Sequence, residues 1–487
     1  MIRELVNLAV TEGRRRQSKQ TGFVHYCYYA DESEHHDTIP TYENLLFVLA
    51  LLRSRIGDNI TEAKRMLEKV LSYQNKVGGH SPGNFPICLH EYPFCFDRWH
   101  GVQLLAPLYW IHHHFHSILG RKLAAQVRNA AEENIKHCLL TLKENSADYL
   151  TTLNIATAAK ALGKDLDLPD IEKEGEELLA ILSGMGSQPV WFSSQGLSRM
   201  IASLQLVYPT ICKSPWQEFW EHLERMWHVP TQSYCGPAFD EWSQGAEPMP
   251  TLYDLYMGHL SGSLSKRCSL PHHCHLEAAL IQFTEDHIRA VSFPRTLQEE
   301  VGTQKCQTYF AKTYAYSSIE QNGKIDPQSL KGFHPFRLVW GDLAQMHTLV
   351  CQGGNIKAMN AIAGKDQVEF IFDLGEPKEK DKFVENREVV FYCSKGDGLK
   401  LTVDGARATT FRLGEKVQLK SSIDMNLTFE LIEGEGNFLG HLMPGNRLSQ
   451  QDRSTEAQDW QIFLRNIERT PCCRVRVTLQ IQPQNVV

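Results

Sequence analysis

The chain has 487 residues, of which 42% are hydrophobic, 22% charged and 10% aromatic, and its formal net charge at pH 7 is -7. These fractions are typical of a folded protein of several domains and exclude collagen-like, coiled-coil and wholly disordered chains. A net acidic chain without a long basic run also argues against nucleic acid as a partner.

The N-terminal segment predicts neither export nor membrane insertion. Glu4 and Asn7 interrupt its apolar stretch, and the arginines 14–16 follow that stretch, whereas a signal peptide begins with basic residues. The longest purely apolar run, 45–52, is far shorter than the roughly 20 residues that span a bilayer. The 13 cysteines form no Cys-x-x-Cys pair, which favours free thiols in a reducing compartment. We therefore expect a cytoplasmic protein with no membrane partner, or a periplasmic one if a leader has been removed.

Helical periodicity dominates the first 290 or so residues. Segment 42–55 is apolar on nearly all sides and predicts a buried helix, whereas 61–74 keeps its apolar residues on one stripe. This pairing of a buried and a surface helix recurs along the chain, with pairs beginning near residues 41, 99, 148, 193 and 251. Inner helices that cover one another while outer helices face water form a closed double ring. We predict a helical (α/α) toroid over 1–295, including a helix at 276–288.

Beyond about residue 300 the hydrophobic period changes to two, which is typical of strands. Turn signals such as Asp404-Gly405, 433–436 and 444–446 separate the segments. The predicted strands are 307–316, 331–340, 367–373, 388–393, 400–403, 416–419, 426–432, 460–464 and 474–481. So many short strands at this spacing predict an antiparallel β-sandwich over 300–487. The predicted fold class is therefore α+β multidomain, with a helical toroid followed by a β-sandwich.

This order of elements resembles the polysaccharide lyases of the heparinase II/III and alginate-lyase type. The resemblance spans nearly the whole chain and rests on architecture, not on a motif. It implies cleavage of uronate-containing polysaccharides by a Tyr or His base, with an Asn, His or Arg that neutralises the substrate carboxylate. Several glycoside hydrolase families share the same two-part plan.

The link 78–100 holds the densest group of polar and aromatic residues. Carbohydrate sites combine flat aromatic surfaces with a few convergent polar groups. The candidate acid/base residues of this link are His90, Glu91, Asp97 and His100. Its candidate substrate-binding residues are His80, Asn84, Arg98 and Trp99. In the alternative interpretation the link is structural: Arg98 pairs with Asp97 or Glu91, and the aromatic residues cover one end of the ring.

A second group lies in the link that precedes and enters the helix predicted near 252. Asp240 and Glu241, beside Trp242 as a binding residue, suit a glycosidase, whose two carboxyl groups lie about 5–10 Å apart. Tyr234 and Tyr253 suit a lyase base. The alternative is a pair of solvent-facing acids beside a packed tryptophan. The prediction of one site requires this link and the link 78–100 to meet around one concavity.

From the sandwich, His334 and Arg447 are candidate substrate-binding residues, with packing between domains as the alternative. His112 and His116 share a helix face at a spacing that can bind metal, and 272–275 (His-His-Cys-His) is a further cluster. No P-loop and no dinucleotide-binding glycine pattern is present. We predict no cofactor, and no metal in the site.

The predicted function is that of a lyase-like, carbohydrate-active enzyme that acts on an oligosaccharide or polysaccharide ligand. The first alternative is a glycoside hydrolase on the same architecture. The second is a non-catalytic protein that binds carbohydrate or another protein. The sequence does not indicate an oligomeric state.

Overall fold

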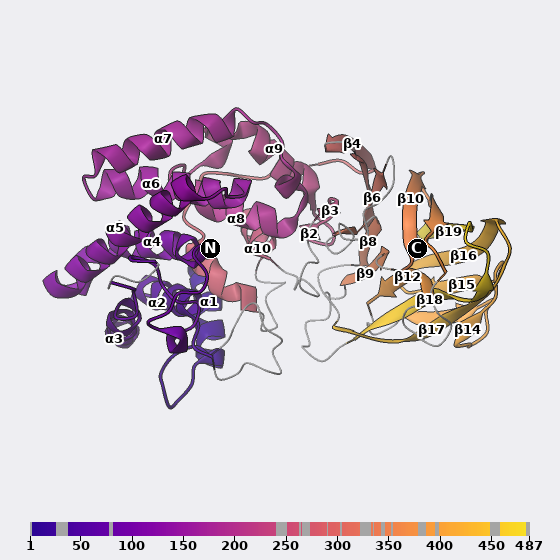
Figure 1. Cartoon of the computed structure of the whole chain (residues 1–487), viewed down its shortest axis with the longest axis horizontal. Helices are drawn as coiled ribbons and strands as arrows, with labels where there is room; N and C mark the ends of the chain where they lie inside the picture. The colour runs from indigo at the N-terminus through magenta and orange to yellow at the C-terminus, as the bar shows by residue number, and fades with distance from the viewer. Residues whose placement is uncertain are drawn as a thin grey trace. The chain divides into compact units, whose positions relative to one another are not determined.

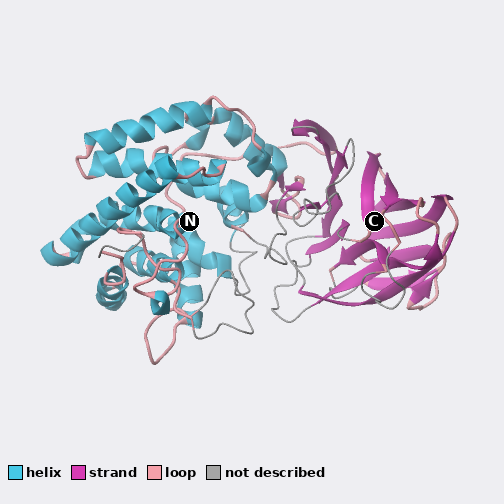
Figure 2. Cartoon of the chain, in the orientation of Figure 1, coloured by secondary structure: helices cyan, strands magenta, loops and turns pink. Residues whose placement is uncertain are grey.

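The computed structural model, shown in Figures 1 and 2, describes most of the chain. The described residues are 2–25, 38–76, 81–239, 251–262, 264, 273–289, 291–301, 304–321, 333–334, 336–341, 346–351, 354–377, 386–394, 399–448 and 458–483.

The chain forms two compact units. The helical unit comprises Met1–Gly186, Gln195–Leu223 and Pro250–Ile288, and the sheet unit comprises Ser187–Ser194, Glu224–Met249 and Arg289–Val487. The two units are interleaved along the chain, because two internal segments belong to the sheet unit. The domain limits predicted from the sequence, 1–295 and 300–487, stay predictions.

The helical elements are mainly α-helices, which Figure 1 labels, with a few 3-10 helices between or after them. The α-helices are α1 (Ile2–Arg16), α2 (Thr41–Arg53), α3 (Gly57–Leu71), α4 (His100–Leu119), α5 (Arg121–Glu144), α6 (Tyr149–Asp165), α7 (Pro169–Ser183), α8 (Ser194–Leu204), α9 (Gln217–Met226) and α10 (Leu252–Leu260). The 3-10 helices are η1 (Leu89–Glu91), η2 (Pro189–Phe192), η3 (Ile211–Lys213) and η4 (His273–Leu280).

The helical unit is built from hairpins of one inner and one outer helix. α2 packs on α3, α4 on α5 and α6 on α7, while the inner helices α2, α4 and α6 pack on one another in turn. η4 packs against α1 and α2, so the end of the unit contacts its beginning. The Arg53 guanidinium, at the end of α2, donates to the carbonyl of Ile281 at 2.8 Å and also to that of Ala279. These contacts close the ring, and the predicted toroid is confirmed.

Apolar patterning explains which helices are inner. Nearly every residue of α2 is buried, as its uniformly apolar sequence predicts, whereas α3 buries one stripe and turns its charged residues to water. α6 begins at the N-cap Asp148, whose carboxylate accepts from the Thr151 backbone N–H at 2.7 Å. Near its end Gly163 allows α7 to approach closely, because a Cβ there would lie 2.4 Å from the backbone nitrogen of Glu172.

The strands, labelled in part in Figure 1 and drawn in magenta in Figure 2, fill most of the sheet unit. They are β1 (Trp227–His228), β2 (Ser233–Tyr234), β3 (Ala238–Phe239), β4 (Arg295–Val301), β5 (Gln304–Phe310), β6 (Tyr314–Gln321), β7 (Phe333–His334), β8 (Phe336–Gly341), β9 (Met346–Cys351), β10 (Ile356–Ala363), β11 (Gln367–Leu374), β12 (Arg387–Cys393), β13 (Lys400–Val403), β14 (Thr410–Phe411), β15 (Lys416–Lys420), β16 (Ile423–Glu433), β17 (Gly436–Leu448), β18 (Gln458–Arg469) and β19 (Arg474–Pro483).

Two antiparallel sheets enclose one core, so the predicted β-sandwich is confirmed. One has the order β10-β11-β19-β16-β15-β13 and the other β14-β17-β18-β12-β9-β8-β6-β5-β4. β11 buries alternate residues, as its period of two predicts. The ring of Phe370 in β11 packs edge to face against the ring of Phe336 in the other sheet, and the ring centres are 4.9 Å apart.

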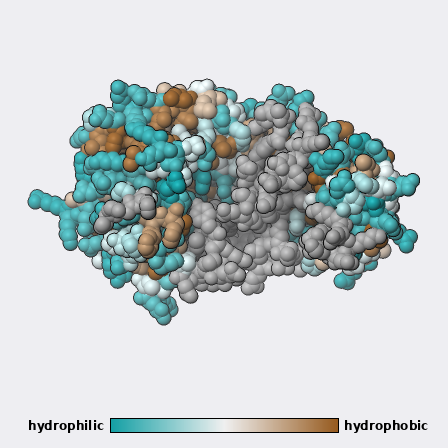
Figure 3. Space-filling model, in the orientation of Figure 1, coloured by the Kyte–Doolittle hydropathy of each residue, from teal (hydrophilic) through white to brown (hydrophobic). Residues whose placement is uncertain are grey.

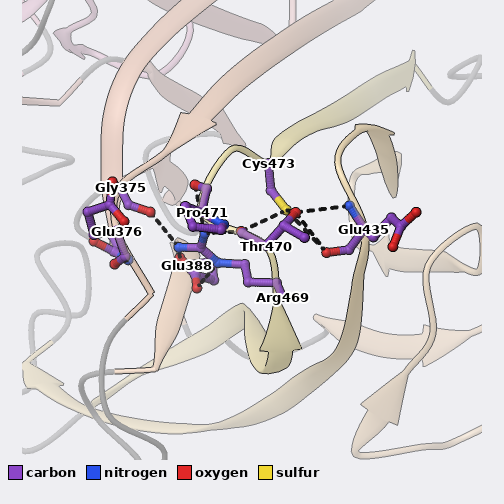
Figure 4. Close-up of polar contacts among 9 residues, drawn as sticks. Gly375, Glu376, Glu388, Glu435, Arg469, Thr470, Pro471 and Cys473 are labelled. Atoms are coloured by element: carbon purple, nitrogen blue, oxygen red, sulfur yellow. Dashed lines mark hydrogen bonds and ion pairs between the residues drawn. The ribbon is translucent and has the colours of Figure 1, made fainter.

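A buried arginine, Arg469, pairs with a glutamate of its own sheet and also bonds to the other sheet, and Figure 4 shows these contacts. Arg469, at the end of β18, donates through two nitrogens to Glu388 of β12, at 2.7 and 3.1 Å. The same guanidinium donates at 2.6 Å to the carbonyl of Gly375, which follows β11 in the other sheet. Both charged side chains are almost fully buried, so their hydrogen bonds to each other and to the backbone compensate for lost hydration.

Two predicted strand limits were wrong. The segment 307–316, predicted as one strand, contains the end of β5 and the start of β6, which pair with each other. The turn at 311–313 lacks the usual Gly, Pro or Asn signal and closes through a 2.8 Å bond from the Ala311 N–H to the Tyr314 carbonyl.

The turn predicted at 444–446 lies within β17, whose register against β18 shifts between Pro444 and Leu448. That bulge accommodates a proline inside a strand.

Two predictions in the helical unit also require correction. Residues 2–16 form α1, which the sequence analysis did not predict. The helix predicted at 276–288 ends at Leu280, and 281–289 is not helical. The Asp286 carboxylate accepts from the backbone N–H groups of Ile211 and Cys212, both at 2.9 Å, and these bonds hold the non-helical segment against η3.

On the face shown in Figure 3, the described residues are largely hydrophilic, with local hydrophobic patches. None of the helices placed in the structure is both long enough and apolar enough to cross a lipid bilayer.

Candidate functional site

The middle of the link predicted to carry the site lies beside the first turn of α2. The Thr41 backbone N–H donates to the Ile87 carbonyl at 2.9 Å, and the Leu89 N–H donates to the Ile39 carbonyl at 2.9 Å. Pro40 and Cys88 form an isolated antiparallel bridge at the same place. Residues 87–91 of the link are therefore held against the start of α2.

Asn84 and Asp97 are used within the fold. Asn84 is fully buried; its amide donates to the Asp97 carbonyl and its oxygen accepts from the Gly101 N–H, both at 2.9 Å. The Asp97 carboxylate accepts from the Trp99 N–H at 2.8 Å. Together these bonds satisfy backbone groups at the start of α4, which would otherwise lack partners.

His100 is buried at the first residue of α4. Its Nε2 lies 2.7 Å from the Thr41 hydroxyl, and its Nδ1 is buried without a hydrogen-bond partner. Burial lowers the pKa of His100 to about 4, a shift that the nearby Asp97 charge only partly opposes. The imidazole is therefore neutral near pH 7 and ties the link to α2.

The remaining polar residues of the link reach solvent. His90 and Arg98 are exposed, while Glu91 and Trp99 are half-buried. Arg98 donates at 2.5 Å to the side-chain oxygen of Asn145, instead of pairing with Asp97 or Glu91 as the structural interpretation supposed. Partial burial raises the pKa of Glu91, although its carboxylate accepts from the Ile87 N–H at 3.2 Å.

Aromatic side chains project from the same link. Phe94 and Phe96 are 65% and 79% exposed, and Tyr92 is 41% exposed. The rings of Phe94 and Phe96 stack with centres 6.1 Å apart and an angle of 21° between their planes. Solvent-exposed phenylalanines are costly unless they serve a contact, and flat exposed rings are what sugar faces stack against.

The second predicted group is divided between the two units. Tyr234 is buried in β2 of the sheet unit, and its hydroxyl donates to the Pro237 carbonyl at 2.5 Å. Tyr253 is buried in α10 of the helical unit, and its hydroxyl donates to the Leu223 carbonyl at 2.7 Å. Both hydroxyls are thus already bonded within the fold.

Several predicted residues cannot be placed. His80, Asp240, Glu241 and Trp242 lie outside the described residues, as do the side chains of His334 in β7 and Arg447 in β17. The predicted catalytic and binding roles, and the predicted meeting of the two links, therefore stay predictions.

The helical unit contains an acid/base group that the sequence analysis did not select. Glu277 of η4 is half-buried, and the Tyr42 hydroxyl of α2 lies 3.5 Å from its carboxylate. Burial raises the pKa of Glu277 to about 7, against opposing effects of the Arg199 charge and the Tyr42 hydrogen bond. Arg199, on α8, is exposed. Two elements far apart in the sequence thus bring an acid and a phenol together, and the Arg199 charge of a third element acts on the acid.

This arrangement is suited to proton transfer. A carboxyl group with a pKa near 7 is present in both protonation states at neutral pH, which is what general acid/base catalysis requires. A carboxylate desolvated in this way destabilises the fold, and such groups are concentrated at functional sites. In the sequence, the feature that could have pointed to Glu277 is its position as the only charged residue of the apolar run 276–281 (Leu-Glu-Ala-Ala-Leu-Ile).

No evidence for a metal cluster is found in the placed part of the chain. Among those residues, no group of three or more His, Cys, Asp or Glu side chains is arranged to hold a metal ion. In the cluster 272–275, Cys274 and His275 are buried in η4, and His272 is outside the described residues.

Comparison with known proteins identifies the architecture. No protein-family model matches the chain, and no curated protein sequence matches it. The chondroitin AC lyase of Streptomyces coelicolor A3, solved with chondroitin sulphate, aligns with a TM-score of 0.50 at 8% identity, over 100% of this chain and 79% of that one.

Two further solved structures are less similar. A heparinase III gives 0.45 at 10% identity, over 99% of this chain and 84% of that one. The heparan sulfate lyase of Pedobacter heparinus gives 0.39 at 11% identity, over 100% and 83%. At 8% identity, the likeness to the chondroitin lyase is one of fold. It confirms that this chain has the helical-toroid and β-sandwich architecture of polysaccharide lyases.

Proposed function

We propose that this protein is a polysaccharide lyase that acts on uronate-containing chains, with acid/base chemistry carried by Glu277 and Tyr42. The observation that carries the proposal is the half-buried Glu277, whose pKa is raised to about 7 and whose carboxylate lies 3.5 Å from the Tyr42 hydroxyl. The lyase-like fold agrees with this assignment without proving it, because fold alone does not specify chemistry.

Arg199 fits the charge requirement of this reaction. Abstraction of the proton next to a carboxylate leaves a carbanion, which a cation on that carboxylate stabilises. Arg199 is exposed and its positive charge acts on Glu277, and we assign it to the substrate carboxylate. Its planar guanidinium can bind both carboxylate oxygens.

The proposed step is a β-elimination. The Glu277 carboxylate removes the proton on the carbon next to the uronate carboxyl group. The electron pair forms a carbon–carbon double bond, and the bond to the neighbouring glycosidic oxygen breaks. Tyr42 donates its phenolic proton to the leaving oxygen, which becomes a hydroxyl group. The products are a shortened chain and a chain with an unsaturated end.

The link 78–100 supplies the proposed substrate-binding surface. It is held at the start of α2, and Thr41, which bonds to Ile87, is the neighbour of Tyr42. Phe94 and Phe96 offer exposed rings for sugar faces, while His90 and Arg98 offer exposed polar groups. The roles predicted from the sequence for His80, Trp99, Asp240, Glu241, Trp242, His334 and Arg447 stay predictions.

Incubation with a panel of acidic and neutral polysaccharides tests the reaction type. Elimination gives an unsaturated product that absorbs in the ultraviolet, whereas hydrolysis gives only new reducing ends. An ultraviolet signal with uronate-containing substrates supports the proposal. Reducing ends without that signal would favour the glycoside hydrolase, and binding without either product would favour the non-catalytic alternative.

Variants then test the residues. Tyr42→Phe and Glu277→Gln should each reduce kcat/KM by about 10²–10⁴-fold, the usual contribution of a positioned acid or base. Tyr208→Phe, at another half-buried tyrosine of the helical unit, is the matched control and should keep the wild-type rate. Retention of full activity by Tyr42→Phe and Glu277→Gln would refute the assignment even if the protein is a lyase.

A further inference from the structure

The last part of α4, at the opposite end of the helix from His100, carries four histidines: 112, 113, 114 and 116. Two of them stack on aromatic residues one turn earlier. The His113 ring lies 5.1 Å from that of Tyr109 with 18° between the planes, and the His114 ring lies 5.1 Å from that of Trp110 with 9° between the planes. The remaining two, His112 and His116, face each other one turn apart, with ring centres 6.0 Å apart.

Hydrogen bonds fix the tautomers of this pair. The His112 Nδ1 lies 2.9 Å from the Asp165 carboxylate at the end of α6. A carboxylate only accepts hydrogen bonds, so Nδ1 of neutral His112 carries the proton. The His116 Nδ1 lies 3.2 Å from the backbone carbonyl of His112, which likewise only accepts. Both rings therefore keep an Nε2 lone pair available for a ligand.

The free nitrogens are accessible. His116 is exposed to solvent. His112 is half-buried, but its Nε2 is not a buried atom without a hydrogen-bond partner, so it reaches solvent. No hydrogen bond is recorded for either Nε2 in the described part of the chain. An imidazole whose Nδ1 is bound to a carboxylate or a carbonyl, and whose Nε2 is open, is the usual state of a metal-binding histidine.

Asp165 is bonded to two histidines of α4. Besides His112 Nδ1, its carboxylate accepts from His113 Nδ1 at 3.0 Å. The negative charge beside His112 makes the opposite nitrogen a better electron donor to a metal.

We propose that Nε2 of His112 and Nε2 of His116 bind one divalent transition-metal ion, of which Zn²⁺ is the reference case, with Asp165 positioning His112. Water completes the coordination, because no third ligand is in place among the described residues. Imidazole nitrogens suit zinc, copper and nickel, whereas magnesium and calcium prefer oxygen. The site is distinct from the proposed acid/base pair and does not depend on the proposed function.

The geometry requires only a small adjustment. Two imidazoles bound to a tetrahedral ion at about 2.0–2.1 Å have ring centres roughly 5 Å apart. The observed separation is 6.0 Å, so the rings must approach by about 1 Å. His116 is exposed and can move by side-chain rotation, whereas Asp165 holds His112.

Calorimetric titration of the full chain with Zn²⁺ near neutral pH tests the site. Relative to wild type, His112→Ala and His116→Ala should each lose one bound ion or at least tenfold in affinity. Asp165→Asn should weaken the same ion by about 10–100-fold, as loss of such a supporting carboxylate usually does. His113→Ala, which removes the other histidine bonded to Asp165, is the control and should retain the ion.

Copper provides a second readout that a merely structural role would not affect. Electron paramagnetic resonance of the Cu²⁺-loaded chain should show nitrogen ligands that are lost in His116→Ala and kept in His113→Ala. His116 is exposed, so its replacement leaves the fold intact, which circular dichroism can verify. Unchanged stoichiometry and affinity in His112→Ala and His116→Ala would overturn the site, and unchanged affinity in Asp165→Asn would overturn the role of Asp165.

Discussion

Replacing Glu277 by Gln should separate the cost of this carboxyl group to the fold from its proposed chemistry. Gln keeps the size of the side chain and an oxygen that can accept from Tyr42, but it carries no charge. In the folded protein the pKa of Glu277 is about 7, against an ordinary value of 4.5. The folded state therefore binds the proton more tightly than the unfolded state, so wild-type stability falls as the pH rises from 4.5 through 7.

The size of the effect follows from that difference. The interval from 4.5 to about 7 corresponds to roughly 3 kcal/mol, and solvent at the exposed edge of Glu277 reduces this value. We expect the unfolding free energy of Glu277→Gln, relative to wild type, to rise by about 1–3 kcal/mol between pH 5 and pH 8. The same variant should lose elimination activity, so its gain in stability and its loss of function arise from one substitution.

Urea unfolding of both proteins at several pH values between 5 and 8, followed by circular dichroism, measures this difference. Glu285→Gln is the control. Glu285 pairs with Lys213 at 2.7 Å, and this contact lowers its pKa, so its titration lies below 4.5 and outside the measured range. The unfolding free energy of Glu277→Gln relative to wild type should change with pH, whereas that of Glu285→Gln should not. If neither changes between pH 5 and pH 8, the Glu277 carboxyl group does not titrate near 7 and the reasoning fails.

Three further predictions concern packing and can be measured by urea unfolding. Arg469→Met should lower the free energy of unfolding by about 3–5 kcal/mol, because it leaves Glu388 charged and unpaired. Adding Glu388→Leu to this variant should restore much of the loss. Equal stability of the single and the double variant would contradict the prediction. Gly163→Ala should cost about 1–3 kcal/mol, because the new methyl group meets the Glu172 backbone; a neutral result would mean that α7 moves freely. Asp148→Ala should cost about 1 kcal/mol and Asp148→Asn much less, and equal losses would show that the cap is not a hydrogen bond.

The architecture was predictable because it is encoded in local patterns. The uniformly apolar α2 and the striped α3 indicated an inner and an outer helix, and the alternation in β11 indicated a half-buried strand. Register was less predictable: the turn at 311–313 has no local signal, and only pairing between β5 and β6 creates it.

The candidate site was less accessible from sequence. The composition of link 78–100 pointed to a polar surface, but it could not distinguish the buried, helix-capping Asn84 from the exposed Arg98. The Tyr42–Glu277 contact joins residues 235 positions apart, and no motif records such a distance. Only the closed ring brings them together, and only burial, which is a property of the fold, shifts the pKa of Glu277.

The interleaving of the two units constrains how the protein can be made and divided. During synthesis α1 leaves the ribosome long before its partner η4 at residues 273–280, so α1 must wait for most of the ring. Closing so long a loop is entropically costly and slow. A cut near residue 295 would also deprive the C-terminal fragment of 187–194 and 224–249. Neither half should therefore be obtainable by simple truncation, and a split protein would have to reassemble from pieces that exchange segments.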